Sequence, residues 1–131
     1  MKKKILFCLI ILVLIIILVI VGMLLTVNKN FNQLKNAQIL NIDLSEIEDG
    51  TYSGSYSKTP VSAEVCVTVK NHAITEIIIV KHDNGKGGAA ETITDRIIQS
   101  QSLEVDTVTG ATFSSLVIIK AVENALTNKA A

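Results

Sequence analysis

Residues 61–80 read VSAEVCVTVKNHAITEIIIV, and this stretch decides the fold. Its first half, 61–70, alternates apolar and polar residues, a pattern typical of a strand with one buried face. Asn71-His72 separates it from a second β-branched run, Ile74–Val80. Because Asn tolerates positive φ, this pair predicts a tight hairpin. The second run is apolar at consecutive positions, so we expect it to lie centrally in the sheet, covered on both faces.

The residues on either side of this hairpin complete a small domain. Upstream, Gly50–Ser57 (GTYSGSYS) predicts a first strand with a bulge at glycine. Downstream, a glycine-rich loop over 82–88 leads into a predicted helix over 89–101, whose isoleucines fall on one helical face.

A last helix is predicted near the end of the chain, with Ser114 or Ser115 as its N-cap. Its apolar residues repeat along one side, and we expect Lys120, Glu123 and Asn124 on the opposite face. Strands followed by helices indicate an α+β fold, with a small, mostly antiparallel sheet and helices packed on one side of it.

An apolar run precedes the domain. Ile5–Leu25 contains no charged residue, and as a helix it spans roughly 30 Å, the thickness of the hydrocarbon core of a bilayer. No small-x-small cleavage site follows it, so we expect an uncleaved transmembrane helix rather than a signal peptide. Three lysines, at positions 2–4, precede the run. They favour a single-pass protein of the cell membrane with a cytoplasmic N-terminus and an extracytoplasmic C-terminal domain.

The chain therefore divides into three expected parts. Residues 1–27 hold the lysine cluster and the transmembrane anchor. Residues 28–48 are polar with scattered apolar residues, and we expect a linker or stalk there that leads off the membrane. Residues 49–131 form the domain, which begins at a turn signal, Asp49-Gly50.

Composition and charge exclude several classes of function. The 131 residues carry no net charge, but residues 30–131 hold eight basic and twelve acidic residues, a net charge of −4. This acidity argues against nucleic acid as a partner, since binding phosphates needs clustered Lys and Arg. Cys8 and Cys66 match neither a zinc-binding spacing nor a disulfide framework, and we expect no metal site.

A hydroxyl-rich loop, DTVTGATFSS over 106–115, runs into the last helix. Gly110 and Ala111 are small, so a ligand or an enzyme can approach the backbone closely. Thr109 and Thr112 present hydroxyls, and the free N–H groups of a helix N-terminus favour an anion such as phosphate. An ordinary Ser/Thr cap before a structural helix is the alternative from these residues alone.

The segment DTVTGAT, residues 106–112, resembles the Asp-x-x-Ser/Thr-Gly-Ala-Thr signature of the FMN-binding domain family. That family includes the C subunit of the sodium-pumping NADH:quinone reductase, the G subunit of the related Rnf complex and small membrane-anchored extracytoplasmic flavoproteins. The opening segment Asp49–Gly54, the hairpin and the glycine loop resemble the family as well. The likeness extends from Asp49 to Leu126.

The resemblance implies a set of site residues. Thr112 would carry FMN covalently, as a phosphoester installed by a flavin transferase that uses FAD. A threonine hydroxyl is a weak nucleophile, so attachment needs an activating enzyme. Asp106 would belong to the segment that the transferase reads. The other expected binding residues shape the turn and present donors to the phosphate: Thr109, Gly110, Ala111 and Ser114.

Three further features are weaker candidates for the flavin site. Gly87 and Gly88 would approach the flavin through backbone N–H groups, unless they form only a surface turn. His82 would hydrogen-bond the flavin, unless it is an exposed residue at a strand end. Glu91 would line the flavin pocket, the alternative being an acid that merely begins a helix.

The function that these expectations support is electron transfer rather than stand-alone catalysis, and no catalytic residue is assigned. The flavin would accept electrons from a membrane-bound donor and pass them to an external or membrane acceptor, with lipid around the anchor. Two alternatives remain open. One is a flavin-dependent reductase of a small acceptor, and the other is a flavin-free, membrane-anchored interaction module.

Overall fold

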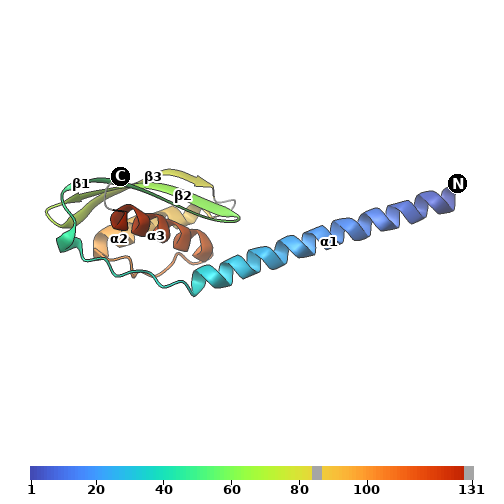
Figure 1. Cartoon of the computed structure of the whole chain (residues 1–131), viewed down its shortest axis with the longest axis horizontal. Helices are drawn as coiled ribbons and strands as arrows, with labels where there is room; N and C mark the ends of the chain where they lie inside the picture. The colour runs from blue at the N-terminus through green and yellow to red at the C-terminus, as the bar shows by residue number, and fades with distance from the viewer. Residues whose placement is uncertain (84–86, 129–131) are drawn as a thin grey trace.

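The computed structural model describes residues 1–83 and 87–128 of the chain. Three α-helices, three strands and two short 3-10 helices follow one another, and Figure 1 shows α1 projecting away from a domain built by the rest. In chain order the elements are α1 (Lys2–Lys35), η1 (Leu44–Glu46), β1 (Gly50–Lys58), β2 (Val61–Lys70), β3 (Ala73–Asp83), η2 (Gly88–Thr92), α2 (Ile93–Ser100) and α3 (Thr112–Thr127).

The strands form one antiparallel sheet in the order β1-β2-β3, and α2 and α3 cover the same face of it. The predicted α+β class and the hairpin at Asn71-His72 are therefore confirmed, and both residues have positive φ. The predicted glycine bulge in β1 is wrong. The pairing of β1 with β2 is regular from Gly50 to Lys58, and the irregularities lie between β2 and β3 instead.

Gly54 serves helix packing rather than a bulge. It lies in β1 on the face that α3 covers. A Cβ atom at this position would lie 2.7 Å from the Cα atom of Ala125, closer than real Cβ atoms approach. The missing side chain therefore lets α3 pack directly on the backbone of β1.

The expectation that Ile74–Val80 lies centrally, covered on both faces, is wrong. β2 is the central strand, and β3 is an edge strand with one open face. Ile78 and Val80 are 49% and 59% exposed on it. The side chain of Gln101 protects part of the free edge: it accepts from the N–H of Ile74 (2.7 Å) and donates to the carbonyl of the same residue (2.8 Å).

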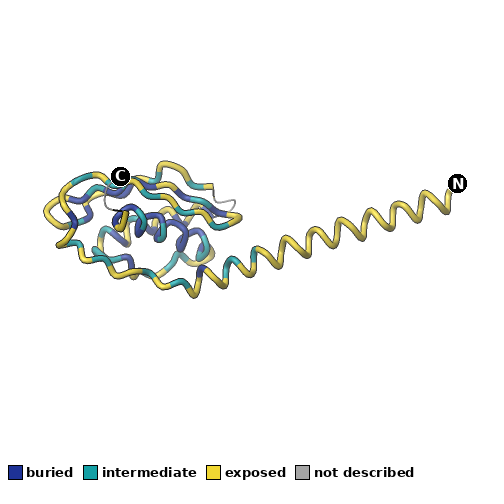
Figure 2. The backbone as a smooth tube through the Cα atoms, in the orientation of Figure 1, coloured by how far each residue is buried: buried dark blue, intermediate teal, exposed yellow. Residues whose placement is uncertain are grey.

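The hydrophobic core lies between the sheet and α3. The buried alternate residues of β2, at 61, 63, 65, 67 and 69, face α3, as the alternation in the sequence predicts. Figure 2 shows the buried backbone running through β2 and along α3. The helix is buried almost all round, because the sheet covers one side and the segment 36–49 passes over another.

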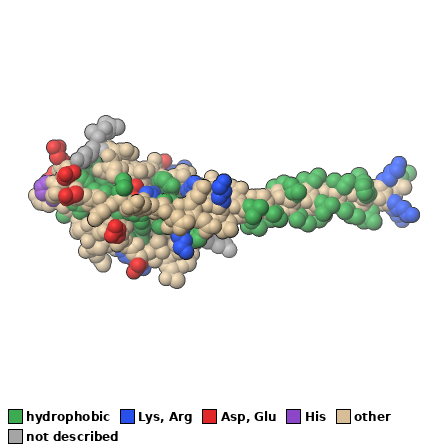
Figure 3. Space-filling view, turned by 60° about the horizontal axis from the view of Figure 1, so that its bottom comes forward, with side chains coloured by type: hydrophobic (Ala, Val, Ile, Leu, Met, Phe, Trp, Pro, Cys, Tyr) green, Lys and Arg blue, Asp and Glu red, His purple; other side chains and the backbone are tan. Residues whose placement is uncertain are grey.

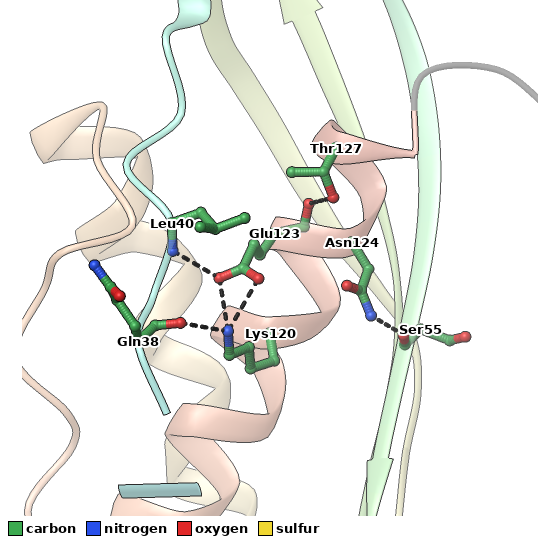
Figure 4. A network of polar contacts seen from close by, with 7 residues as sticks. All are labelled: Gln38, Leu40, Ser55, Lys120, Glu123, Asn124 and Thr127. Atoms are coloured by element: carbon green, nitrogen blue, oxygen red, sulfur yellow. Dashed lines mark hydrogen bonds and ion pairs between the residues drawn. The ribbon is translucent and has the colours of Figure 1, made fainter. Parts of the chain in front are cut away.

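A polar network joins that segment to α3 (Figure 4). Lys120 Nζ donates to the carbonyl of Gln38 at 2.7 Å, and the N–H of Leu40 donates to Glu123 Oε2 at 3.0 Å. Lys120 and Glu123 also form an ion pair at 2.9 Å. Lys120 and Glu123 therefore lie on the side of α3 away from the sheet, as expected, but the segment 36–49 covers this side and Glu123 is buried. The expectation is wrong for Asn124, which is half-buried and faces the sheet, where it donates to the carbonyl of Ser55 in β1.

The residues expected to form a stalk, 28–48, lie against the domain. Their first part continues α1 to Lys35, and Leu34 and Ile47 belong to the hydrophobic core. Asp43 begins η1 and accepts hydrogen bonds from the hydroxyl and the N–H of Ser45. These two bonds hold the pKa of Asp43 below its usual value.

Among the described residues, α1 is the one helix that is long and apolar enough to cross a membrane. Its apolar run is fully exposed in Figure 2, whereas its C-terminal end meets the domain. There, Asn30 Nδ2 donates to the carbonyl of Thr59, and Lys58 Nζ donates to Gln33 Oε1, both at 2.9 Å. This helix is consistent with a single-pass anchor or with a signal sequence.

Candidate functional site at the start of α3

A tight turn delivers the hydroxyl-rich loop into α3. The N–H of Ala111 donates to the carbonyl of Val108 at 2.9 Å, which closes a turn over 108–111. Gly110 has a φ of +79° at the third position of this turn, where glycine is favoured because a side chain would strain the backbone. α3 begins directly after the turn, at Thr112.

The prediction that Ser114 or Ser115 caps α3 is wrong, because both residues lie inside the helix. Ser115 is fully buried and ties the helix to the loop. Its hydroxyl accepts from the N–H of Val108 at 3.0 Å and donates to the carbonyl of Ala111 at 2.8 Å. Ser115 therefore fixes the turn from within, and the helix begins two residues before the earlier of the expected caps.

The first turn of α3 offers backbone donors. The N–H groups of the first residues of a helix have no acceptor within it. The position before Thr112 is Ala111, which has no side-chain acceptor, and in the described part of the chain no side chain caps the helix there. The amides of Thr112, Phe113 and Ser114 are therefore available to an anion, which the helix dipole also favours.

Arg96 holds the upstream half of the loop. It lies on α2, and its Nη1 atom donates to the carbonyls of Asp106 (2.8 Å) and Thr107 (3.2 Å). The side chain of Asp106 is exposed, as are Thr109 and Gly110. The loop thus presents Asp106 and Thr109 to solvent, while Arg96 and Ser115 fix its backbone.

A cavity of about 640 Å³ opens beside the start of α3. Four described parts of the chain wall it: the end of α1, the start of β2 with the turn before it, the residue before η2, and the turn that leads into α3 with the first residues of that helix. Thr112 is half-buried in this wall, and no group within the described ranges hydrogen-bonds its hydroxyl. The described lining residues are Leu24, Val27, Asn28, Phe31, Pro60, Val61, Gly87, Gly110, Ala111, Thr112, Phe113 and Ser114.

The sequence profile of the FMN-binding domain family matches residues 56–127, more than half of the chain. The chain belongs to the FMN-binding domain family. The match contains β2, β3 and the whole loop before α3, and it begins within β1 at Tyr56. Comparison with curated proteins gives no match.

Membership of the FMN-binding domain family implies FMN as the ligand, and the cavity fits this molecule. Its volume falls within the roughly 300–1,000 Å³ that is usual for small-molecule sites. The lining is mainly apolar, which suits a flat aromatic ring, and the uncapped amides at Thr112–Ser114 suit a phosphate. No described residue of the lining has an ionisable side chain.

An aromatic pair lines this cavity. Phe31 of α1 and Phe113 of α3 stack with ring centroids 5.9 Å apart and an interplanar angle of 26°. Sequence reasoning missed both residues. Phe31 falls in the expected stalk, and the one available signal was that these are two of only three phenylalanines in a chain without tryptophan.

The weaker candidates for flavin contact divide between the cavity and its surroundings. Gly87 is buried and lines the cavity, whereas Gly88 is exposed and begins η2. His82 and Glu91 lie outside the lining. His82 Nδ1 lies 3.2 Å from Glu91 Oε1, and the imidazole is only 2% exposed, so the alternative of an exposed strand-end histidine is wrong. Lys86 lies outside the described residues.

Proposed function

We propose that the protein is a membrane-anchored flavoprotein that carries FMN as a phosphoester on Thr112 and relays electrons. One observation carries this proposal. The chain is a member of the FMN-binding domain family, and Thr112 is the first residue of its α3. The Thr112 hydroxyl lies beside uncapped amides and lines a cavity of about 640 Å³. A phosphate attached there would receive the helix donors, and the flavin ring would enter the cavity.

The attachment requires a separate enzyme, a flavin transferase. The Thr112 hydroxyl is a weak nucleophile without a base, and the described cavity lining offers no ionisable side chain to activate it. With FAD as donor, a bond forms between Thr112 Oγ1 and the phosphorus of the FMN moiety. The diphosphate bond of FAD breaks, and AMP leaves with the hydroxyl proton.

The chain's own residues position the acceptor. Gly110 allows close approach to the turn, and Arg96 and Ser115 hold its backbone in place. Asp106 presents its carboxylate to solvent, where a transferase can read it. Bound FMN supplies the redox chemistry, and the protein supplies burial, orientation and tethering.

The anchor sets the location of this carrier. The apolar run of α1 is exposed along its whole length, which is costly in water and favourable in lipid. The preceding lysines favour a cytoplasmic N-terminus and an extracytoplasmic domain. A covalent link prevents loss of flavin by dilution outside the cell. Electrons would come from a membrane-bound donor and pass to an external or membrane acceptor.

The surface suggests how a partner docks. Figure 3 shows acidic side chains gathered at the end of the domain away from α1. An acidic end favours a partner with a basic docking patch, because complementary charge speeds association.

Intact-mass measurement tests the attachment. The full chain, coexpressed with a flavin transferase, should gain the mass of one FMN minus one water. Thr112→Ala removes the acceptor and should gain nothing, while Thr112→Ser keeps a hydroxyl at the same place and should still be modified.

Thr109→Ala is the matched control, because it removes a neighbouring, exposed hydroxyl from the same loop. It should leave the mass gain intact. An unmodified wild-type chain, in cells where the transferase modifies another substrate, contradicts the proposed function. Modification of the Thr112→Ala chain contradicts the proposed site.

A further inference from the structure

We infer that α1 is part of the flavin site as well as an anchor: its C-terminal turns wall the cavity and hold the flavin ring at the membrane surface, beside Phe31. This inference rests on the proposed function and adds the position of the ring relative to the lipid.

α1 turns one face toward the cavity. Four of its residues line the cavity: Leu24, Val27, Asn28 and Phe31. Their spacing of i, i+3, i+4 and i+7 places them on one side of the helix. A continuous stripe of α1 therefore forms one wall of the cavity.

This stripe of α1 is fixed to the domain. Asn30 donates to the turn after β1, and Gln33 accepts from Lys58 at the end of β1. The stacked phenylalanines join α1 to α3. Leu34 is 2% exposed and belongs to the domain core. α1 thus enters the domain as one of its packed elements, without a flexible tether between the apolar run and the cavity.

The end of the apolar run sets the depth of the cavity in the membrane. The apolar run ends at Leu25, and its neighbour Leu24 already lines the cavity. Phe31 lies six residues beyond Leu25, about 9 Å along the helix axis. The headgroup layer on each side of a bilayer is about 5–8 Å thick. The cavity therefore reaches from the edge of the hydrocarbon through the headgroups.

The different chemistry of two parts of the cavity orients the flavin. The phosphate would lie at the amides of Thr112–Ser114, whereas the wall contributed by α1 is mostly apolar and carries an aromatic ring. The isoalloxazine ring is flat and aromatic, so it stacks favourably beside Phe31. The membrane-bound donor then meets the ring at the level of the lipid headgroups.

Fluorescence quenching of the flavin in the full-length, flavinylated protein tests this placement. The protein is reconstituted into phosphatidylcholine vesicles that contain lipids with nitroxide on the headgroup. Headgroup nitroxide should quench the flavin at least twofold, and aqueous iodide should quench it several-fold less than it quenches free FMN.

Phe31→Ala should at least double the iodide quenching constant. Phe7→Ala is the matched control, since it removes the same side chain from the same helix far from the cavity, and it should change nothing. Iodide quenching as strong as that of free FMN, or an unquenched flavin beside headgroup nitroxide, overturns the inference.

The two proposals fail in different ways. A wild-type chain without covalent flavin contradicts the proposed function. A chain that carries flavin on Thr112 but shows no headgroup quenching contradicts only the placement by α1. If Phe31→Ala accepts no flavin, the nitroxide measurement on the wild-type chain still decides.

Discussion

Two glycines show how single residues set the geometry of the site. Gly110 has a positive φ and open space around the position of a Cβ atom, so its requirement is conformational. Gly54 has ordinary strand conformation, and a Cβ there would collide with the backbone of α3. Both glycines look alike in the sequence, but the physical reason for each differs.

Their alanine variants should therefore differ in stability. Gly110→Ala should lower the free energy of unfolding by about 1 kcal/mol, the cost of a left-handed alanine. Gly54→Ala should cost about 3 kcal/mol, because α3 must move away from β1. Thermal unfolding of the full chain in detergent, followed by circular dichroism, measures both. Gly22→Ala, with no neighbour near its Cβ, is the control; equal effects of Gly54→Ala and Gly22→Ala would refute the packing role.

Arg96 should control the rate of flavin attachment. Arg96→Met keeps an apolar stem but removes both hydrogen bonds to the loop, so the loop is ordered less often and initial flavin loading should fall several-fold. Arg96→Lys keeps one donor and should restore part of the rate. Mass spectrometry over a time course of transferase treatment gives the rates. Equal loading of the Met variant and the wild type would show that the clamp is dispensable.

For single residues, the sequence reveals local chemistry but misses contacts with residues that are distant along the chain. The signature that ends at Thr112 is contiguous, so the candidate acceptor follows from the sequence. Arg96 and Phe31 act on residues at least ten positions away, through packing that no local pattern records. His82 likewise has a buried side chain because Glu91 and the fold cover it.

The elements of the domain follow largely from periodicity. The alternation over 61–70 is correct in both span and buried face. The place predicted for the next strand is wrong, because β3 lies at the edge of the sheet and Ile78 and Val80 alternate onto its open face. A consecutive apolar run indicates burial on both faces only when other elements cover both, and here both described helices of the domain, α2 and α3, lie over the same face of the sheet.

α3 deviates from its predicted amphipathic form because the segment 36–49 covers its polar side. Glu123→Ala should therefore destabilise the domain by about 3 kcal/mol, since it leaves Lys120 and the N–H of Leu40 without a carboxylate. Chemical denaturation of the full chain in detergent measures this loss.

The double variant Lys120→Met/Glu123→Leu separates charge from packing. It removes both charges and fills their place with apolar groups, and it should recover most of the loss. A Glu123→Ala chain as stable as the wild type would mean that the segment contributes no binding energy through this carboxylate.

The whole molecule combines an exposed apolar helix, a cavity at the C-terminal end of this helix, and an acidic surface at the end of the domain away from α1. The apolar helix and the fold class follow from the sequence. The cavity does not, since its walls come from residues up to ninety positions apart along the chain. The continuity of α1 into the domain is the feature that changes the expected picture most, because it places the site beside the end of the apolar run.

For the whole molecule, we predict that the N-terminus lies in the cytoplasm and the domain outside the cell. In a cysteine-free background, Ser55→Cys on the exposed face of β1 should react with a membrane-impermeant maleimide on intact cells, and Lys3→Cys should react only after lysis. Quantifying the labelled fraction of each variant measures the orientation. The reverse pattern would place the domain in the cytoplasm and exclude an extracytoplasmic carrier.

Peptide mapping of the flavinylated chain tests the central claim most directly. Trypsin cuts after Arg96 and Lys120, so the loop and the start of α3 fall in one peptide, residues 97–120. Fragmentation of that peptide should place the mass of FMN minus water on Thr112. An unmodified peptide despite an active transferase, or a flavin on any other residue, would contradict the account.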